Sequence, residues 1–534
     1  MKLKISTILF MILPNFILAQ SQEAVTIGLD QKIDKAFKPF SDFVSNVVFF
    51  EVFNGAPFVI VLLVFSALFF TFYFGFPNIK YFGKAIGVVR GKYDHVDNSS
   101  SLNSDLAIDG DIKDTISDES KEGEVTHFQA LATAVSGTVG NGNIAGVALA
   151  IALGGPGATF WMIVCGLLGM STKFVECTLG VQYRDIGEDG TVYGGPMYYL
   201  SKGLKEKGFT ILGKITAVLF AIFCIGGSFG GGNAAQSNQA TIVIKDLLGL
   251  NSSSAGAIIG VVLALLVGVI IIGGIKRIAS VTEKIVPFMA VLYLLACLYI
   301  IVLNFSLVDD AFSLIITQAF NPKAIGVGGI IGVLLVGFKR AAFSNEAGAG
   351  SASIAHSAVK TKYSASEGLV ALLEPFIDTV VICTMTALVI IIFNFGGAFE
   401  YGGTNGTVLI EGVAYEGAGI TSMAFAEYIP YSNVFLTIAV VLFAVSTMIS
   451  WSYYGLQSWK YLFGRGKAAD LTYKILFLVF VVIGAAASMN SIWAFSDAMI
   501  FAMVFPNMIG LFFLFPVVKK QLARYLNAID KEKS

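Results

Sequence analysis

The sequence predicts an all-α polytopic membrane protein with about eleven transmembrane helices, and three observations support this fold class. Of 534 residues, 56% are hydrophobic and 13% are charged, whereas about a quarter of an ordinary soluble domain is charged. Long apolar runs recur along the chain, each able to cross a hydrocarbon core about 30 Å thick as a helix. The runs lack the strict alternation of barrel strands, so helices are the consistent interpretation.

The chain begins with a predicted signal peptide, residues 1–19. Lys2 and Lys4 precede an apolar run that is too short to span a membrane comfortably. A retained signal anchor is the alternative, because Pro14 interrupts the run and the cleavage site is imperfect. A short extracytoplasmic segment, 20–56, then leads into the first helix.

The predicted helices are one additional span at 57–77 and two groups of five. The groups cover 127–304 and 324–516, and an external loop at 305–323 joins them. The ten later spans are centred on 127–150, 158–182, 211–243, 253–273, 281–304, 324–343, 367–394, 433–457, 472–490 and 492–516.

Lysine and arginine collect in every second loop, which is the pattern of cytoplasmic loops. The loop at 395–432, by contrast, contains neither residue type. The mature N-terminus is therefore predicted outside and the tail at 517–534 in the cytoplasm, with the protein in the plasma (inner) membrane. The cytoplasmic loop at 78–126 contains an insert, 94–126, that is rich in Asp, Ser and Gly. We expect this insert to be solvated and mobile, an acidic regulatory or metal-sensing patch being the alternative.

The second span contains a stretch suited to an opened helix. Residues 136–143 comprise three glycines, two asparagines, two hydroxyl residues and one valine. An opened backbone there frees carbonyls for a cation and amide N–H groups for a carboxylate, as in the discontinuous helices of secondary transporters. Close packing through small residues is the alternative, but it does not require Asn141 and Asn143 at the centre of a span.

The seventh span carries a second glycine-rich stretch, 326–332, at the corresponding place in the second half. Span two starts in the cytoplasm and span seven starts outside, so the two halves are oppositely oriented. This pattern predicts an inverted repeat with one broken helix in each half.

Several sequence blocks resemble the alanine/glycine:cation symporter family. They are 140–148, 152–157, 172–177, 274–278, 283–290, 339–348 and 450–455, and the match runs from about 57 to 516. The resemblance implies a LeuT-type five-plus-five inverted repeat that imports alanine, and glycine with it, by symport with sodium through alternating access. A proton-coupled carrier of small neutral amino acids is one alternative, and an ion channel is another.

The resemblance also implies which residues form the site. It places the amino-acid carboxylate at the opened backbone and adds contacts from two other spans: the set is Thr138, Gly140, Asn141, Gly142, Asn233, Gln236, Thr447 and Trp451. It implies a sodium site in which carbonyls of Ser136 and Val139 meet the hydroxyl residues Ser446 and Thr447. Trp451 would restrict the pocket to small side chains, with a place in an interfacial aromatic belt as the alternative. No cofactor is expected beyond sodium as the coupling ion.

Four charged residues fall inside the predicted spans. Lys173 and Glu176 are three apart and are expected to form a structural pair or a cytoplasmic gate. Asp378 and Asp497 have no obvious partner in the sequence, and a proton or cation role for Asp378 stays open.

Other classes of function find little support. The net charge of −1 and the absence of a basic face argue against nucleic-acid binding. The five cysteines form no CxxC pair, and no catalytic constellation predicts an enzyme. His127 and His356 fall at cytoplasmic ends of spans, where we expect loop histidines and not a proton relay. A channel would normally repeat a filter around an axis or carry rings of charge. The expected partners are alanine or glycine, sodium and the lipid bilayer.

Overall fold

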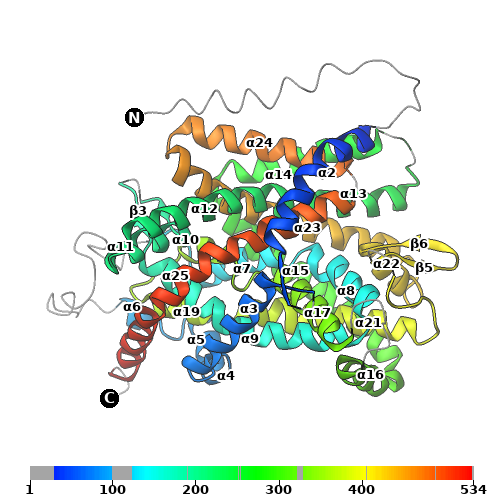
Figure 1. The fold of residues 1–534 in the computed structure, drawn as a ribbon, viewed down its shortest axis with the longest axis horizontal. Coiled ribbons are helices and arrows are strands. Elements are labelled where there is room, and N and C mark those ends of the chain that lie inside the picture. Colours follow the sequence, from blue (N-terminus) through cyan, green and yellow to red (C-terminus); the bar gives the residue numbers. More distant parts are fainter. Residues whose placement is uncertain are drawn as a thin grey trace.

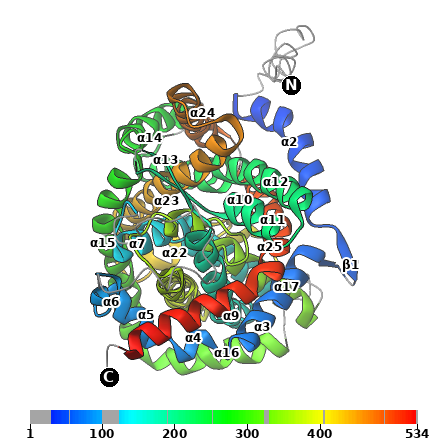
Figure 2. The ribbon, with the colours of Figure 1, turned by 90° about the vertical axis from the view of Figure 1, so that its left-hand side faces the viewer.

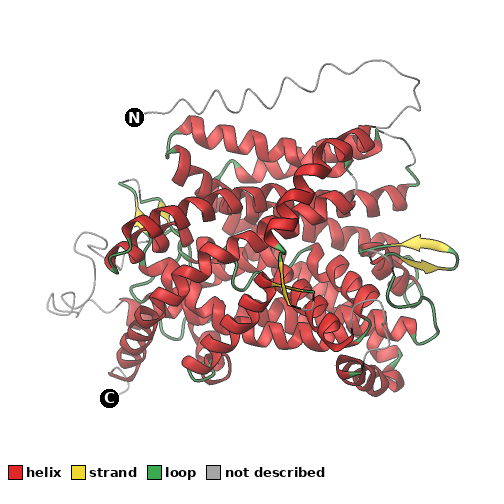
Figure 3. Ribbon diagram, viewed as in Figure 1, coloured by secondary structure: helices red, strands yellow, loops and turns green. Residues whose placement is uncertain are grey.

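The structure is a computed structural model that describes residues 29–53, 55–98, 123–188, 190–250, 252, 254–321, 329–403, 406–487 and 489–531. The predicted signal peptide, residues 99–122 of the acidic insert and residues 326–328 lie outside these ranges. Within the described part the chain is almost entirely helical, with three small antiparallel sheets of two strands each (Figure 3).

Long helices form the body of the protein (Figure 1). They are α3 (Phe58–Tyr73), α9 (Gly157–Gln182), α12 (Thr210–Phe229), α13 (Ala235–Leu248), α14 (Ala255–Ile271), α15 (Gly274–Leu303), α17 (Gly329–Asn345), α21 (Thr384–Asn394), α23 (Ser432–Phe463), α24 (Lys467–Ala486) and α25 (Met489–Lys531). α14 and α24 lie side by side at one edge (Figure 2).

Other helices interrupt or connect the long ones. They are α2 (Leu29–Val48), α4 (Pro77–Lys80), α5 (Phe82–Val89), α6 (Asp94–Asn98), α7 (His127–Thr138), η2 (Gly142–Gly146), α8 (Val147–Gly154), α10 (Pro196–Tyr198), η3 (Tyr199–Gly203), α11 (Leu204–Glu206), η4 (Gly230–Ala234), η5 (Phe305–Leu307), α16 (Val308–Phe320), α18 (Ala352–His356), α19 (Ser364–Ala371), α20 (Leu373–Pro375), η7 (Phe376–Cys383) and α22 (Ala418–Ala426).

The strands form three separate hairpins. They are β1 (Glu51–Phe53) with β2 (Ala56–Pro57), β3 (Asp185–Ile186) with β4 (Val192–Tyr193), and β5 (Val408–Ile410) with β6 (Val413–Tyr415). In the third hairpin the central pair is Leu409 opposite Ala414.

The helices confirm a polytopic membrane protein. The described residues contain seven helical stretches long and apolar enough to cross a bilayer, or eight if the bent pair of α7 and α8 counts as one span. α3 and α14 are also apolar, but they have only 16 and 17 residues. The number of eleven spans and the five-plus-five repeat stay predictions.

Regular structure also occurs in segments predicted as connections. The N-terminal segment contains α2, which lies along α25 (Figure 1). The loop at 305–323 contains α16, and the loop at 395–432 contains the hairpin of β5 and β6 followed by α22.

The second predicted span is broken near its middle, where the glycines and asparagines predict it. α7 starts with a capping box in which Thr126 Oγ1 accepts a hydrogen bond from Gln129 N at 3.2 Å. It ends at Thr138, and the next residue, Val139, is extended, with φ of −74° and ψ of 91°. The chain resumes in the π-helix η2 and in α8, and the two halves are bent by 51°.

A second break lies beyond the predicted glycine-rich stretch, of which residues 326–328 lie outside the described ranges. Of the stretch at 326–332, the described residues Gly329 and Gly332 belong to the continuous helix α17. The chain unwinds instead after Asn345, because Glu346, Gly348 and Gly350 take positive φ values of 55°, 96° and 88°. α18 follows this unwound segment, residues 346–351.

Candidate functional site

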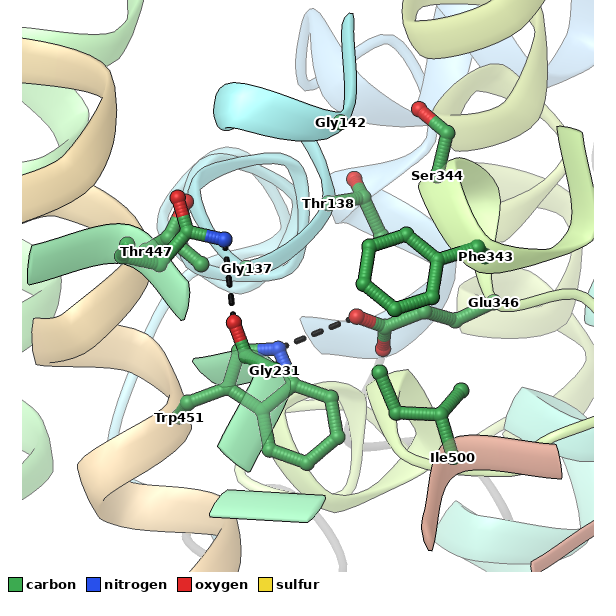
Figure 4. A pocket seen from close by; sticks show the side chains of 11 residues that line it. Gly137, Thr138, Gly142, Gly231, Phe343, Ser344, Glu346, Thr447, Trp451 and Ile500 are labelled. Carbon is green, nitrogen blue, oxygen red and sulfur yellow. Dashed lines mark hydrogen bonds between the residues drawn. The ribbon is translucent and has the colours of Figure 1, made fainter. Parts of the chain in front are cut away.

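A small cavity lies between the two breaks (Figure 4). Its lining comes from α7, η2, η4, α13, α17, the unwound segment, α23 and α25. The lining residues are Gly137, Thr138, Gly142, Gly231, Gln236, Phe343, Ser344, Glu346, Thr447, Trp451 and Ile500. The cavity volume of about 10 Å³ matches roughly one water molecule.

Gln236 joins the first break to the neighbouring π-helix. Its Oε1 accepts a hydrogen bond from the backbone N of Asn141 at 3.1 Å, and its Nε2 donates to the carbonyl of Gly231 at 3.0 Å. Asn141 Nδ2 in turn donates to the carbonyl of Gln236 at 3.3 Å. Gln236 therefore binds one amide of the opened backbone through a buried hydrogen bond.

Gly140 sets how closely α7 approaches α23. A Cβ atom at Gly140 would collide with Thr447 Oγ1 and lie 3.3 Å from Gln236 Oε1. Thr447 Oγ1 and Asn141 Oδ1 are buried and lack a hydrogen-bond partner within the described structure. Unpaired buried oxygens are costly, so these two atoms are suited to receive a donor or a cation.

Glu346 brings a carboxylate to the cavity. Its Oε1 accepts a hydrogen bond from Trp451 Nε1 at 3.0 Å, and its Oε2 accepts one from Ser351 Oγ. Figure 4 shows Glu346 and Trp451 facing each other, with Phe343 and Ile500 beside them. Both donors are neutral, so neither hydrogen bond supplies a cation to the carboxylate of Glu346.

Large apolar side chains close the cavity. The Trp451 side chain is 1% exposed, and a Cβ atom at Gly232 would collide with it. Phe343 and Ile500 are also buried, and a Cβ atom at Gly231 would lie 2.6 Å from Ile500 Cδ1. Trp451 therefore packs within the protein and does not lie in an interfacial belt.

The residues implied for sodium lie where α7 meets α23. Ser136 Oγ donates to the carbonyl of Ser446 at 2.7 Å, and Val139 directly follows α7. Ser446 Oγ donates to the carbonyl of Phe443 at 3.0 Å. The structure thus brings Ser136 and Ser446 together, while the hydroxyl of Ser446 is already engaged within its own helix.

Three residues implied for the substrate do not line the cavity. Gly140 and Asn141 lie directly behind it, at the break. Asn233 faces α24, because its Nδ2 donates to the carbonyl of Phe477 at 2.6 Å. Thr138, Gly142, Gln236, Thr447 and Trp451 are the implied residues that do line the cavity.

Asp378 lies behind Ser344, one of the lining residues. Its Oδ1 accepts hydrogen bonds from Asn143 Nδ2 at 2.6 Å and from Ser344 Oγ at 3.1 Å. Its Oδ2 accepts one from Thr379 Oγ1 at 2.7 Å. Asp378 therefore connects η7 to both broken helices.

The other buried charges have partners that the sequence did not suggest. Lys173 pairs with Glu374 at 3.0 Å and not with Glu176, which accepts a hydrogen bond from Asn507 Nδ2 at 2.7 Å. The predicted pairing of Lys173 with Glu176 was wrong, because α20 brings a carboxylate from about two hundred positions away.

Asp497 is also paired, contrary to its apparent isolation in the sequence. It forms ion pairs with Arg340 and, at 3.1 Å, with Lys339. The guanidinium of Arg340 lies 5.4 Å from the centroid of Phe343, one turn closer to the cavity. This group links α17 to α25 beside the site.

His127 and His356 are buried, which overturns their prediction as loop histidines. The Nδ1 atom of each lies within hydrogen-bond distance of a different oxygen of Glu367. The carboxylate that joins them is far from His127 in the sequence, so spacing gave no indication of this contact.

The sequence reasoning also missed Glu346, Phe343, Ser344 and Ile500 in the cavity. The pattern that points to Glu346 is an acidic residue within Asn345-Glu346-Ala347-Gly348-Ala349-Gly350, a glycine-rich stretch that follows an apolar helix. Phe343 and Ile500 resemble any other apolar residue of a span, so their place depends on how the helices pack.

Together, these residues suit a small zwitterion. The opened backbone and the amide groups can bind a carboxylate, and the carboxylate of Glu346 can bind an ammonium group. The apolar side chains limit the size of the solute that fits between these two groups. Both charged ends of such a solute would otherwise be costly to bury.

The chain is similar to known transport proteins. Residues 41–534 match the model of the sodium:alanine symporter family. The sodium/alanine symporter AgcS of Methanococcus maripaludis is 39% identical over 92% of this chain and 99% of its own length. The putative sodium/proton-dependent alanine carrier protein YrbD of Bacillus subtilis is 37% identical over 74% of this chain and 80% of its own. The probable sodium/glutamine symporter GlnT of Bacillus subtilis is 34% identical over 75% and 78%.

Among solved structures, MhsT in complex with L-phenylalanine is similar in fold. It matches with a TM-score of 0.51 at 14% identity, over 76% of this chain and 99% of that chain. This likeness shows that the chain shares the LeuT-type fold of that structure.

Proposed function

Because the chain belongs to the sodium:alanine symporter family, we propose that it imports alanine, and glycine with it, by symport with sodium. Its relatives are transporters and not enzymes. Transport proceeds by alternating access, in which the cavity opens in turn to either side of the plasma membrane. The mature N-terminus lies outside and the C-terminus in the cytoplasm, as the distribution of Lys and Arg predicts.

The observation that carries this proposal is the pairing of Glu346 with an opened helix across one small cavity. The ammonium group of the substrate takes a place beside Glu346, and its carboxylate meets the backbone around Thr138 and Gly142. Trp451, Phe343 and Ile500 enclose the side chain. Alanine and glycine share both charged groups and differ by one methyl group, so a site of this kind accepts both.

Sodium binds where Ser136 and Val139 approach α23. Carbonyl oxygens at the end of α7 and the unpaired Thr447 Oγ1 supply oxygen ligands, which hard cations prefer. Thr447 also lines the cavity, so one side chain touches both the ion and the amino acid. This shared residue supports coupling of their movements.

Uptake into proteoliposomes tests the proposal. Alanine, glycine, serine and glutamine are offered under a sodium gradient alone and a proton gradient alone. We expect accumulation of alanine and glycine with sodium, and competition by alanine but not by propionate, which lacks the ammonium group. Full uptake with potassium replacing sodium at a fixed pH gradient would contradict sodium coupling and favour a proton-driven carrier.

Counterflow distinguishes a carrier from a channel. Vesicles loaded with unlabelled alanine should take up labelled alanine faster than empty vesicles, because a carrier returns across the membrane with its substrate. Equal rates in both preparations would indicate a channel.

A further inference from the structure

Five ionisable side chains form a continuous buried row that the transport site does not use. They are His127, Glu367, His356, Glu374 and Lys173, from α7, α19, α18, α20 and α9. His356 Nδ1 lies 2.5 Å from Glu367 Oε1, His356 Nε2 lies 3.6 Å from Glu374 Oε2, and Lys173 Nζ donates to Glu374 Oε1 at 3.0 Å. All but His127 are fully buried, and His127 is 8% exposed.

One end of this row opens onto a second cavity, of about 330 Å³. Its lining residues are Val88, Val89, Gly91, Asp94, Thr126, His127, Phe128 and Lys360. They lie on the face that the basic loops assign to the cytoplasm. His127 thus places one end of the row at this cavity, and Lys173 lies at the other end.

Hydrogen bonding fixes where protons stand along most of the row. Glu367 places one carboxylate oxygen beside each imidazole, and when Glu367 is ionised both histidines carry a proton on Nδ1. That leaves His356 Nε2 facing Glu374 Oε2. Both atoms are buried and lack a hydrogen-bond partner within the described structure, and their separation is too long for a hydrogen bond.

One proton bound between His356 Nε2 and Glu374 Oε2 changes the net charge of the row. Without it, a nitrogen lone pair faces a carboxylate oxygen, and two carboxylates are balanced by Lys173 alone. With it, His356 becomes a cation that attracts Glu374, and the row is neutral. A buried row that is neutral costs less than one that carries a net charge, so the folded protein binds the proton more tightly than the unfolded chain does.

Other titratable groups surround the row. Glu176 and Cys177 lie on α9 beside Lys173, Glu346 lies in the unwound segment, and Tyr454 faces Glu374 from α23. Asp94 and Lys360 line the mouth of the cavity, and Glu283 of α15 accepts a hydrogen bond from Gln129 of α7. The carboxylates among them add to the attraction for a proton, while Lys360 opposes it at the mouth.

From this geometry we infer that His356 and Glu374 form a proton-binding site that exchanges protons with the cytoplasmic side of the protein. The bound proton ties α18 to α20 and, through Glu374 and Lys173, to α9. α18 directly follows the unwound segment that carries Glu346. Binding of the proton therefore determines how firmly the unwound segment is held. As a result, the rate of transport depends on the pH on the cytoplasmic side, where the second cavity lies.

Thermal unfolding of the purified protein tests proton binding without any transport. In His356→Gln the amide donates to Glu374 at every pH. We expect the wild type to lose stability relative to this variant as the pH rises, by up to about tenfold in the unfolding equilibrium per pH unit where the proton dissociates. The exposed His95→Gln is the matched control, and its curve should parallel that of the wild type. Parallel curves for His356→Gln as well would overturn the proton site.

Uptake in right-side-out membrane vesicles tests the consequence for transport, and this arm rests on the proposed function. We expect sodium-driven alanine uptake by the wild type to vary with the internal pH and to stay constant when only the external pH changes. His356→Gln should lose this dependence, and His95→Gln should keep it. Wild-type dependence on the external pH alone would contradict access from the cytoplasmic side even if a variant failed to fold. Absence of alanine uptake at every pH would refute the proposed function but leave the unfolding experiment to decide the proton site.

Discussion

Single side chains determine which amino acid the cavity accepts. Trp451 combines two roles, since its ring closes the cavity while its Nε1 donates to Glu346. Trp451→Phe should weaken alanine uptake and raise the ratio of leucine to alanine uptake, because a smaller ring leaves volume that alanine does not fill. A methylene-sized difference is worth about 1–3 kcal/mol, so we expect a shift in preference and not a new substrate.

Two controls accompany the Trp451 measurement. Trp459→Phe changes the same residue type two turns further along α23, outside the cavity lining, and should leave the ratio of uptake rates unchanged. Gln236→Ala should lower the uptake of every substrate by the same factor, because it removes a polar partner of the backbone groups that all amino-acid substrates share. If Trp451→Phe and Gln236→Ala altered all substrates by the same factor, Trp451 would not be the wall of the site.

Glu346 is predicted to bind the group that all substrates share. Glu346→Gln keeps the shape of the side chain and removes its charge, so the KM for alanine and for glycine should rise together by roughly tenfold or more, the value of a hydrogen bond to a charged group. Initial rates of uptake over a range of concentrations give the KM. The exposed Glu427→Gln serves as the control. If the KM rose for alanine but not for glycine, Glu346 would instead contact the side chain of the substrate.

At the scale of elements, the unwound segment after α17 depends on glycines in the left-handed region. Gly350 has φ +88°, and a Cβ atom there would lie 2.8 Å from Pro196 Cγ and 3.0 Å from Asn507 Cγ. Gly350→Ala should therefore lower the melting temperature by combining backbone strain with a clash, at a cost of about 1–3 kcal/mol for the backbone alone. Gly397→Ala is the matched control, with φ +75° and open space around it. If both changes lowered the melting temperature equally, the contacts around Gly350 would not contribute to stability.

Sequence patterns predicted elements better than they predicted partners. The break after α7 followed from Gly140, Asn141 and Gly142, since residues that tolerate an opened backbone are local information. The unwound segment after α17 was not predicted, because glycine content alone does not distinguish a helix start, as at Gly329, from an unwound segment, as at Gly350. A positive φ at Glu346 has no marker in composition.

The partners of buried charges show why the rest could not be predicted. Lys173 had a carboxylate three positions away, yet it pairs with Glu374, because the packing of α9 against α20 decides the contact. Likewise, Glu367 joins two histidines that come from α7 and α18. Side-chain pairing across a bundle depends on helix rotation and on which helices are neighbours, and a single sequence specifies neither directly.

At the scale of the whole molecule, the predicted orientation can be tested with cysteine chemistry. All five native cysteines are buried, so a cysteine introduced at an exposed position reports on its own surroundings. Tyr431→Cys, at a residue that is 86% exposed, should react with a membrane-impermeant maleimide added outside intact cells. Gly466→Cys, at the other end of α23, should react only after the cells are opened. The reverse pattern would invert the topology.

The ion pair between Arg340 and Asp497 has a consequence for hydration. Arg340 and Asp497 are each 5% exposed, and Arg340 Nη1 and Asp497 Oδ1 lack hydrogen-bond partners in the described structure. Parting α17 from α25 would leave two opposite charges in a dry environment unless water enters between them. The gap between α17 and α25 must therefore fill with water as these helices separate. The step should consequently respond to osmotic pressure, slowing in solutions of large solutes that cannot follow the water into the gap.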